Sequence, residues 1–238
     1  MLLFYLRHGD PIYSPDSLTP LGHRQAEALA KRLALYGLDE IYASTSNRAQ
    51  LTARPTCELL KMEPVILPWA DEKYAWAQLA NQCPDGHGRW VFEQKDRVLQ
   101  MTSPEARALG RKWYQHPYFE GTTYGEGIER VQREADAWLA GFGYEHDLER
   151  DLYYCKDTTP RRVALFAHQG FGLAFLSCVL DVPYNIFSTH FNMTHSGMSV
   201  IQFPEEEGWG TPKLLQLSGD GHLYREGLPT RYNNGLRF

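Results

Sequence analysis

Residues 2–9 read Leu2-Leu3-Phe4-Tyr5-Leu6-Arg7-His8-Gly9, an apolar run that ends in an arginine, a histidine and a glycine. A continuous apolar run of this length is typical of a strand that is covered on both faces, as in a parallel sheet between helices. In open α/β sheets, ligands bind beyond the carboxyl ends of the strands. The stretch therefore predicts a layered α/β fold and places Arg7 and His8 where a binding site is expected.

Two later stretches repeat this arrangement of a buried strand followed by polar side chains. Residues 163–167 form a second apolar run, which His168 and a helical pattern follow. Residues 41–43 predict a third strand, and Arg48 comes shortly after it. Because the carboxyl ends of parallel strands lie at one edge of a sheet, we expect His8, Arg48 and His168 to converge.

Strand and helix patterns alternate through most of the chain, which favours a three-layer α/β sandwich with a mostly parallel central sheet flanked by helices. Thr19-Pro20 predicts a helix start and Gly37 its end. We expect a single domain over residues 1–238, in which residues 69–120 form an inserted lid of helices and loops, because the alternation stops there. Further strands are predicted at 64–67 and in a hairpin of 199–203 with 213–217, and further helices at 44–60, 90–100, 104–114, 126–138 and 172–180.

The composition argues against several classes of protein. Lys and Arg number 24 against 29 Asp and Glu, a net charge of -5, whereas proteins that bind nucleic acid or anionic membranes are normally basic. The four cysteines are widely spaced, which argues against a disulfide framework or a structural zinc site. No targeting segment or membrane-spanning run is visible, so we expect a cytoplasmic protein without nucleic-acid or membrane partners. A homodimer is the default assembly.

Arg7, His8 and Gly9 have the chemistry to bind and attack a phosphoryl group. A guanidinium makes bidentate contacts with phosphate oxygens, a neutral imidazole nitrogen can act as a nucleophile, and glycine permits close approach of the backbone. A salt bridge would explain an isolated Arg-His-Gly or Arg48 equally well, and a core hydrogen bond would explain His168. Three such groups at equivalent positions in an acidic protein favour an anion-binding site.

These stretches resemble the motifs of the histidine phosphatase superfamily, in its phosphoglycerate mutase-like branch 1. The matching motifs follow one another from the first strand to the last third of the chain. Gly127 stands where the family's Gly-Glu-Ser element has its serine, and residues 69–120 and the C-terminal tail are outside the resemblance. The motifs are Leu6-Arg7-His8-Gly9, Leu18-Thr19-Pro20-Leu21-Gly22 with Gln25-Ala26, Ser44 to Ala49 with Thr52-Ala53, Gly125-Glu126, and Val163 to Gly170.

The resemblance implies roles for the residues of these motifs. His8 would be the nucleophile that becomes phosphorylated. Positive charge placed around the transferred group is the main catalytic device of phosphoryl transfer, so no metal and no cofactor is expected. The residues that would bind the substrate are Arg7, Gly9, Arg48, His168 and Gln169, and His168 would also be catalytic.

The family also uses a carboxyl group after the third strand as acid and base. Glu72 is the candidate, and it would protonate the leaving oxygen and then activate water. Asp71 is the nearest rival, because the Gly and Trp spacing that follows the glutamate in the family is altered here. A pair of exposed acids without a catalytic role is the other interpretation.

The implied function is hydrolysis of a small-molecule phosphomonoester through a phosphohistidine, by a metal-independent, acid-type histidine phosphatase. The alternative is a phosphoglycerate mutase-type enzyme, which returns the phosphoryl group to a second position of its substrate. Mutases of the family carry an Asn six residues after the nucleophile, where this chain has Ser14. A non-catalytic protein that binds a phosphorylated ligand is disfavoured, because the nucleophile and the phosphate-binding residues are all present.

Substrate choice is expected to lie in residues 10–17, in the insertion and in residues 190–195. His190 and His195 flank a polar stretch and could touch substrate, although we expect them to be surface loop residues. The aromatic side chains of the insertion could line the substrate pocket or form the core of the lid. They are Trp69, Tyr74, Trp76, Trp90, Trp113, Tyr114, Tyr118 and Phe119.

Overall fold

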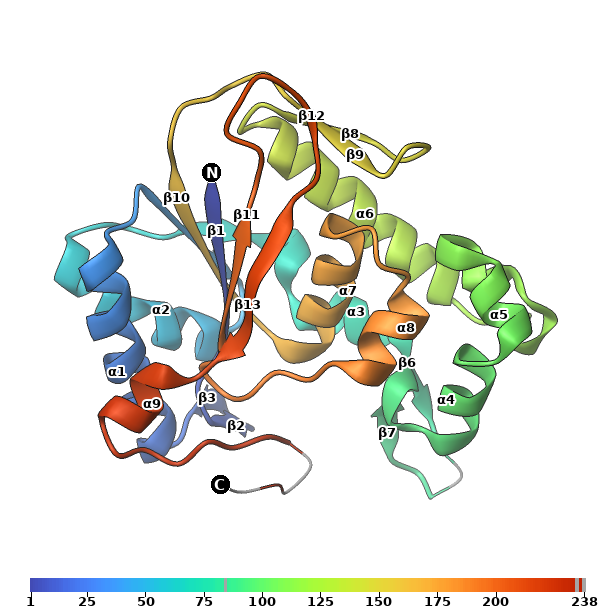
Figure 1. Ribbon diagram of the computed structural model, residues 1–238. Coiled ribbons are helices and arrows are strands. Elements are labelled where there is room, and N and C mark those ends of the chain that lie inside the picture. Colours follow the sequence, from blue (N-terminus) through green and yellow to red (C-terminus); the bar gives the residue numbers. More distant parts are fainter. Residues whose placement is uncertain (84, 234–235, 237–238) are drawn as a thin grey trace.

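The central sheet forms around β1 (Leu2–Arg7), the apolar run quoted above. The computed structural model describes residues 1–83, 85–233 and 236, and Figure 1 shows how their helices and strands are arranged. The other strands of this sheet are β4 (Glu40–Ser44), β5 (Val65–Leu67), β10 (Arg162–Ala167), β11 (Met198–Gln202) and β13 (Lys213–Gly219). Their order is β13-β11-β1-β10-β4-β5. The pairs from β1 to β5 are parallel, and β11 pairs antiparallel with β1 and β13, so the mostly parallel sheet is confirmed.

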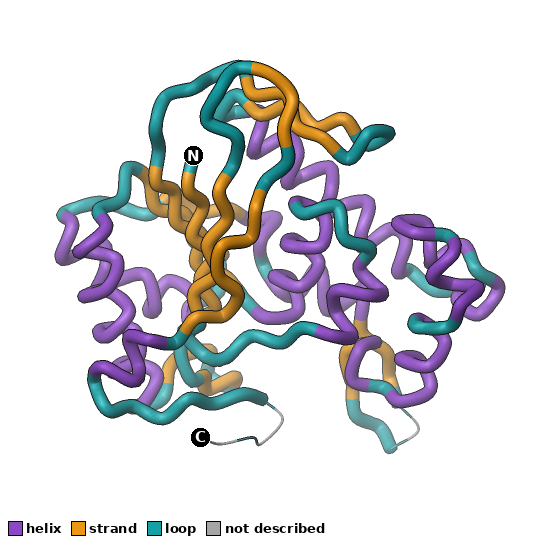
Figure 2. Tube along the Cα trace, in the orientation of Figure 1, coloured by secondary structure: helices purple, strands orange, loops and turns teal. Residues whose placement is uncertain are grey.

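Helices cover both faces of this sheet. They are α1 (Pro20–Tyr36) and α2 (Asn47–Leu60) on one face and α3 (Glu72–Leu79), α6 (Tyr124–Ala140) and α7 (Gln169–Val179) on the other, as Figures 1 and 2 show. Successive side chains of β1 explain this, because Leu3 and Tyr5 pack with α7 whereas Phe4 and Leu6 pack with α1 and α2. The three-layer arrangement is thereby confirmed.

Local sequence signals set both ends of α1. Thr19 Oγ1 accepts a hydrogen bond from Gly22 N at 3.0 Å at the start of α1, and Gly37 follows its last turn with a φ of 72°. The second helix, α2, begins at Asn47, only a few residues after β4. This short connection holds Arg48 at the end of the sheet.

Residues 69–120 contain more regular structure than their composition predicts. Their elements are α3, β6 (Ala80–Gln82), β7 (Gly88–Trp90), α4 (Lys95–Met101) and α5 (Pro104–Ala108), with 3-10 helices at Pro68–Ala70, Val91–Glu93, Gly110–Gln115 and Pro117–Phe119. The helix expected at 90–100 is shorter, because the chain first completes the β6–β7 hairpin. Trp113 and Phe119 belong to the same hydrophobic core as β1 and α7, so the insertion packs into the main core.

The structure also contains elements that the sequence patterns did not reveal. They are β2 (Pro11–Tyr13), β3 (Asp16–Leu18), β8 (Tyr144–Asp147), β9 (Leu152–Cys155), β12 (Gly208–Gly210), α8 (Tyr184–His190) and α9 (Gly221–Arg225). β2 and β3 form a hairpin within the loop that follows β1, and β12, β9 and β8 form a second small sheet. None of the helices in the described part of the chain is long and apolar enough to cross a membrane.

Candidate active site

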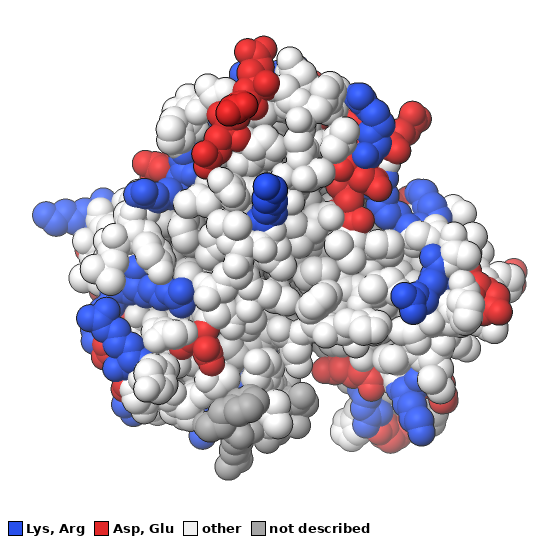
Figure 3. Space-filling view, viewed as in Figure 1, with Lys and Arg blue, Asp and Glu red and all other residues white. Residues whose placement is uncertain are grey.

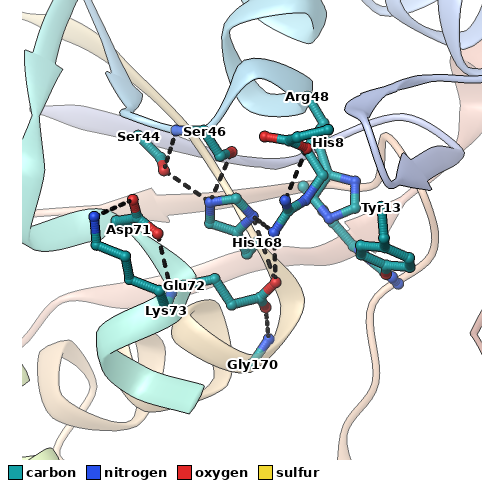
Figure 4. A network of polar contacts seen from close by, with 12 residues as sticks. His8, Tyr13, Ser44, Ser46, Arg48, Asp71, Glu72, Lys73, His168 and Gly170 are labelled. Carbon is teal, nitrogen blue, oxygen red and sulfur yellow. Dashed lines mark hydrogen bonds and ion pairs between the residues drawn. The ribbon is translucent and has the colours of Figure 1, made fainter. Parts of the chain in front are cut away.

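The predicted motif residues meet at the carboxyl end of the parallel strands, as Figure 4 shows for His8, Arg48 and His168. β1 ends at Arg7, and its neighbour β10 ends one residue before His168. β4, on the other side of β10, ends at Ser44 and leads into α2. The order of the strands therefore brings together three motifs that lie far apart in the sequence.

Gly9 lets the chain pass close to the start of α1. Its backbone N–H donates to Thr52 Oγ1 at 3.0 Å, and a Cβ atom at Gly9 would lie 2.6 Å from the carbonyl oxygen of Gly22. A Cβ atom at Gly22 would in turn lie 2.3 Å from the carbonyl oxygen of Asp10. Neither position accommodates a larger side chain, so the two glycines fix the path of the loop that carries His8.

His8 is 1% exposed, and its surroundings favour the neutral ring. Nδ1 lies 2.8 Å from the carbonyl oxygen of Gly9 and donates to it, which leaves the lone pair on Nε2. Burial lowers the pKa of His8 well below 6.5, and Arg7, His168 and Arg48 lower it further. A neutral, oriented imidazole among positive charges is suited to attack on a phosphoryl group.

His168 is fully buried, and its ring centroid lies 5.3 Å from that of His8. Nε2 lies 2.8 Å from Ser44 Oγ, and Nδ1 lies 3.1 Å from Arg48 Nη2. Because a guanidinium can only donate, Nδ1 is the acceptor and Nε2 carries the proton that it donates to Ser44. Burial lowers the pKa of His168 to about 4, so this ring is also neutral at pH 7.

Arg48 and Glu72 form an ion pair beside His168. Arg48 Nη2 donates to Glu72 Oε2 at 2.9 Å, and the same carboxylate oxygen lies 3.6 Å from His168 Nδ1. Glu72 Oε1 accepts from the backbone N–H of Gly170 at 3.0 Å, and Arg48 Nη1 donates to Asp16 Oδ1 at 2.9 Å. The pair places a carboxyl group and a guanidinium next to the same imidazole.

Asp71, the rival acid, has a different set of contacts. Its Oδ1 accepts from Lys73 N at 3.0 Å as the N-cap of α3, and its Oδ2 accepts from Thr45 Oγ1 at 2.5 Å. These contacts stabilise the start of the helix. Glu72, one residue later, contacts Arg48 instead, and its carboxylate lies beside His8 and His168.

Arg7 is fully buried and is held by groups outside the motifs. Nη1 donates to the carbonyl oxygen of Met193 at 2.5 Å, and Nη2 donates to Asn233 Oδ1 at 2.7 Å. Asn233 comes from the C-terminal segment, which runs below the sheet in Figure 1. It was missed at the level of the sequence, because no pattern around it signals a contact with a residue 226 positions away.

His195 is buried beside His8, so the expectation of a surface residue is wrong. The two ring centroids are 6.1 Å apart, and His195 Nε2 lies 2.8 Å from Asn233 Oδ1. Its Nδ1 lies 3.1 Å from Asp10 Oδ1. The physical reason is the antiparallel pairing of β11 with β1, which returns the chain to the site. His190 is exposed, as expected.

The site opens into a cavity of about 570 Å³. Gln169 lines it, and its amide donates to Asn192. Trp76 and Trp90 also line the cavity, whereas Trp113 is buried in the main core. Some aromatic side chains of the insertion therefore line the pocket and others form core, so each of the two interpretations applies to different residues. The lining residues are Arg7, His8, Tyr13, Asp16, Ser46, Arg48, Asp71, Glu72, Lys73, Trp76, Trp90, Glu93, Gln169 and Asn233.

His8, Glu72 and His168 also have the ligand atoms to hold a metal ion, because these atoms lie within 4.8 Å of one another. Arg48 nevertheless donates to both Glu72 and His168. A metal ion would have to displace this guanidinium, whereas an anion would be attracted by Arg48 and Arg7. The arrangement therefore suits a phosphoryl group better than a cation.

An α/β sandwich that gathers two histidines and two arginines at its strand ends defines a class of phosphate-handling proteins. The chain belongs to the histidine phosphatase superfamily (branch 1), whose family model matches residues 3–212. The family predicted from the motifs is thereby confirmed, and the match covers those motifs but not Asn233. Among curated proteins, none matches the sequence.

Solved structures with this fold cover nearly the whole chain. A phosphoserine phosphatase mutant from Entamoeba histolytica in complex with phosphoserine has a TM-score of 0.61 at 17% identity, over 93% of this chain and 98% of that one. A mycobacterial glucosyl-3-phosphoglycerate phosphatase has a TM-score of 0.57 at 20% identity, over 91% and 98%. A putative alpha-ribazole-5'-P phosphatase from Escherichia coli has a TM-score of 0.58 at 20% identity, over 92% and 98%. At these identities the likeness shows the fold.

Proposed function

We propose that this protein is a phosphatase that hydrolyses a small-molecule phosphomonoester through a phosphohistidine on His8. The observation that carries the proposal is the convergence of a neutral His8 with Arg48, His168 and Glu72 at one end of the cavity. Membership of the histidine phosphatase superfamily supports it, as do the three similar structures, which are all named as phosphatases.

In the first step, the substrate phosphoryl group binds between the two arginines and His168. The lone pair of His8 Nε2 attacks phosphorus, the N–P bond forms, and the bond from phosphorus to the ester oxygen breaks. Glu72, which must gain a proton before this step, gives that proton to the leaving oxygen. Charge that spreads over the phosphoryl oxygens in the transition state is stabilised by Arg7 and Arg48.

In the second step, a water molecule attacks the phosphohistidine. Glu72, now a carboxylate, takes a proton from this water, the new O–P bond forms and the N–P bond breaks. Inorganic phosphate leaves, His8 is again neutral and Glu72 is again protonated. The two steps together consume the ester and one water molecule and release the alcohol and inorganic phosphate. The arginines supply the positive charge for which other phosphatases use metal ions.

We expect the reaction to be metal-independent and to persist in acid. His8 attacks in its neutral form, and its pKa is lowered well below 6.5 by burial. The nucleophile therefore remains available as the pH falls through 6.5, where an ordinary histidine would become protonated. Activity in the presence of EDTA and at pH 5.5 would support both features.

The four free cysteines fit a reducing compartment such as the cytoplasm.

The first experiment is hydrolysis of p-nitrophenyl phosphate in EDTA by the wild type and by His8→Ala. We expect turnover in the wild type, loss of at least about 10³-fold in the variant, and acid-labile phosphate on wild-type protein after rapid quenching. Equal activity of the two proteins would exclude His8 as the nucleophile. Transfer of the trapped phosphoryl group to added substrate rather than to water would favour the mutase.

A further inference from the structure

The cavity has two ends of different chemistry. One end holds the motif residues that would take the phosphoryl group. The other is lined from the insertion, and it is here that the organic part of a substrate would lie. The side chains of this outer wall are Asp71, Lys73, Trp76, Trp90 and Glu93. In Figure 3, the lower part of the visible face is hollowed beside the β6–β7 region, with acidic atoms at the margin.

The described lining of the cavity contains three cations, Arg7, Arg48 and Lys73. Arg48 is paired with Asp16 and Glu72 at the phosphoryl end. Arg7 also lies at the phosphoryl end, and Lys73 is the third lysine or arginine of the described lining. Its Nζ lies 3.4 Å from Asp71 Oδ2, and the side chain is 65% exposed. Lys73 is therefore the lysine or arginine of the described lining that lies at the outer wall, and Asp71 already offsets its charge.

Glu93 makes this outer wall acidic. Its Oε2 accepts from the backbone N–H of Trp90 at 3.3 Å, which fixes the carboxylate at the start of the short helix after β7. Among the described residues, no hydrogen bond is formed by its second oxygen. Glu93 Oε1 can therefore accept a hydrogen bond from a ligand hydroxyl, whereas a ligand carboxylate would meet like charge.

Two indole rings form the apolar part of the same wall. Trp76 and Trp90 pack edge to face, with centroids 4.9 Å apart and an interplanar angle of 90°. The Trp90 ring lies against Gly170, where a Cβ atom would come within 2.1 Å of it, so this ring is fixed beside the second histidine motif. Trp76 remains 38% exposed. Flat aromatic surface next to a carboxylate suits an organic group that has both C–H faces and hydroxyls.

We propose that the substrate is the phosphate monoester of a neutral, hydroxyl-bearing group such as a sugar or sugar alcohol, and that Glu93 and the two indoles select it against esters that carry a carboxylate. This inference rests on the proposed function, since it assigns the phosphate to the His8 end. Glu93 is the specificity-determining residue, because it combines the acceptor for a hydroxyl with the repulsion of a second anion.

Two pairs of matched esters test whether the enzyme selects against a carboxylate on the substrate. Glycerol 3-phosphate and 3-phosphoglycerate differ only in a hydroxymethyl group against a carboxylate, and glucitol 6-phosphate and 6-phosphogluconate differ in the same way at a longer reach. We expect kcat/KM to favour the neutral member of at least the longer pair by about tenfold or more. A preference for the esters that carry a carboxylate would overturn the proposal. A stronger preference for phosphoethanolamine would also overturn it, because the outer wall would then bind a positively charged group of the substrate.

Two variants identify the residues responsible. Glu93→Gln keeps the shape and removes the charge, so the preference within the longer pair should fall at least threefold, whereas Glu120→Gln, an exposed acid in the same insertion, should leave it unchanged. Trp76→Leu should lower kcat/KM for glucitol 6-phosphate by about tenfold. Tyr118→Leu, an exposed ring of the insertion outside the cavity, is its control. An unchanged preference in Glu93→Gln would exclude the assigned role.

A binding measurement separates this inference from the proposed function. Calorimetry with His8→Ala reports the affinities for the same two ester pairs without turnover. If the wild type neither hydrolyses any ester nor forms phosphohistidine, the proposed function fails. The affinities still test the selection against a carboxylate. Tighter binding of the neutral esters than of the carboxylate esters supports this selection, and equal or weaker binding overturns it.

Discussion

Two buried clusters in this protein, one with His8 and His168 and one with His146, surround their imidazoles with opposite charges. At the active site, His8 and His168 lie near guanidinium groups, and burial lowers the pKa of both. Between α6 and the end of α7, the ring of His146 is 1% exposed, with Nδ1 2.8 Å from Asp136 Oδ1 and Nε2 3.2 Å from Asp181 Oδ2. Burial lowers the pKa of His146 as well, but the two carboxylates outweigh it and raise the pKa to about 9.

The difference teaches that burial lowers the pKa of all three imidazoles, and that their charged neighbours decide whether this effect is reversed. A positively charged His146 is useful for stability, because it contacts the carboxylates of Asp136 and Asp181, and Arg111 also contacts Asp181. A positively charged His8 would be useless for attack on phosphorus, so the active site surrounds it with cations. The two clusters also oppose each other in acid: the first favours unfolding as the pH falls below 6.5, whereas the second stabilises the fold there.

The largest expected effect comes from removing a cation of the active site. Arg48→Ala should lower kcat/KM for phosphomonoesters by about 10³-fold, because one donor to the transferred phosphoryl group is lost. Arg54→Ala is the matched control, since Arg54 lies on the same helix and makes only an exposed ion pair. Steady-state kinetics of both variants would measure this loss in kcat/KM. Thermal unfolding would show that both variants are folded. A loss below tenfold in Arg48→Ala would contradict the role of this arginine.

A smaller effect, on stability alone, is expected at the other cluster. Asp181→Asn keeps the shape and tolerates the positive φ of 54° at this position, but it removes one of the two charges that hold His146. We expect the free energy of unfolding at pH 6 to fall by about 2 kcal/mol, with hydrolysis unchanged.

The pH dependence has a definite sign. The pKa of His146 is raised from 6.5 to about 9 by folding, so its contribution is complete below pH 6.5 and is lost as the pH rises to 9. Denaturant unfolding at pH 6 and pH 9.5 should therefore show the effect of Asp181→Asn shrinking at the higher pH. Glu145→Gln, at an exposed ion pair with Lys156 on the hairpin that carries His146, should change neither value. A constant difference at both pH values would assign the effect to Arg111 alone.

The smallest effect is expected from loosening His168. Ser44→Ala removes the acceptor that holds the Nε2 proton, while Ser46 Oγ at 3.3 Å remains as a weaker substitute. We expect kcat to fall about five- to tenfold with little change in KM, since Ser44 positions the ring and does not touch substrate. Ser188→Ala, a buried serine of α8 away from the cavity, should leave kcat unchanged. A change in KM alone would show that Ser44 acts on binding.

The sequence predicted the sheet, its flanking helices and the main part of the site. Apolar runs and helix caps are local signals, and the Arg7-His8-Gly9 and His168-Gln169-Gly170 motifs follow strands whose ends must meet if the sheet is parallel. The insertion was harder, because it alternates short strands, 3-10 helices and short α-helices that leave no regular periodicity.

By itself, then, the sequence determined the family and the fold, since His8, His168 and the two arginines are carried by short motifs at strand ends. Only the tertiary structure placed Glu72 beside Arg48, buried His195, brought Asn233 to Arg7 and turned Trp76 and Glu93 toward the cavity. The physical reason is the range of the forces. Caps and periodicity act within a few residues, whereas burial, charge and hydrogen-bond partners at the site depend on segments that fold together from opposite ends of the chain.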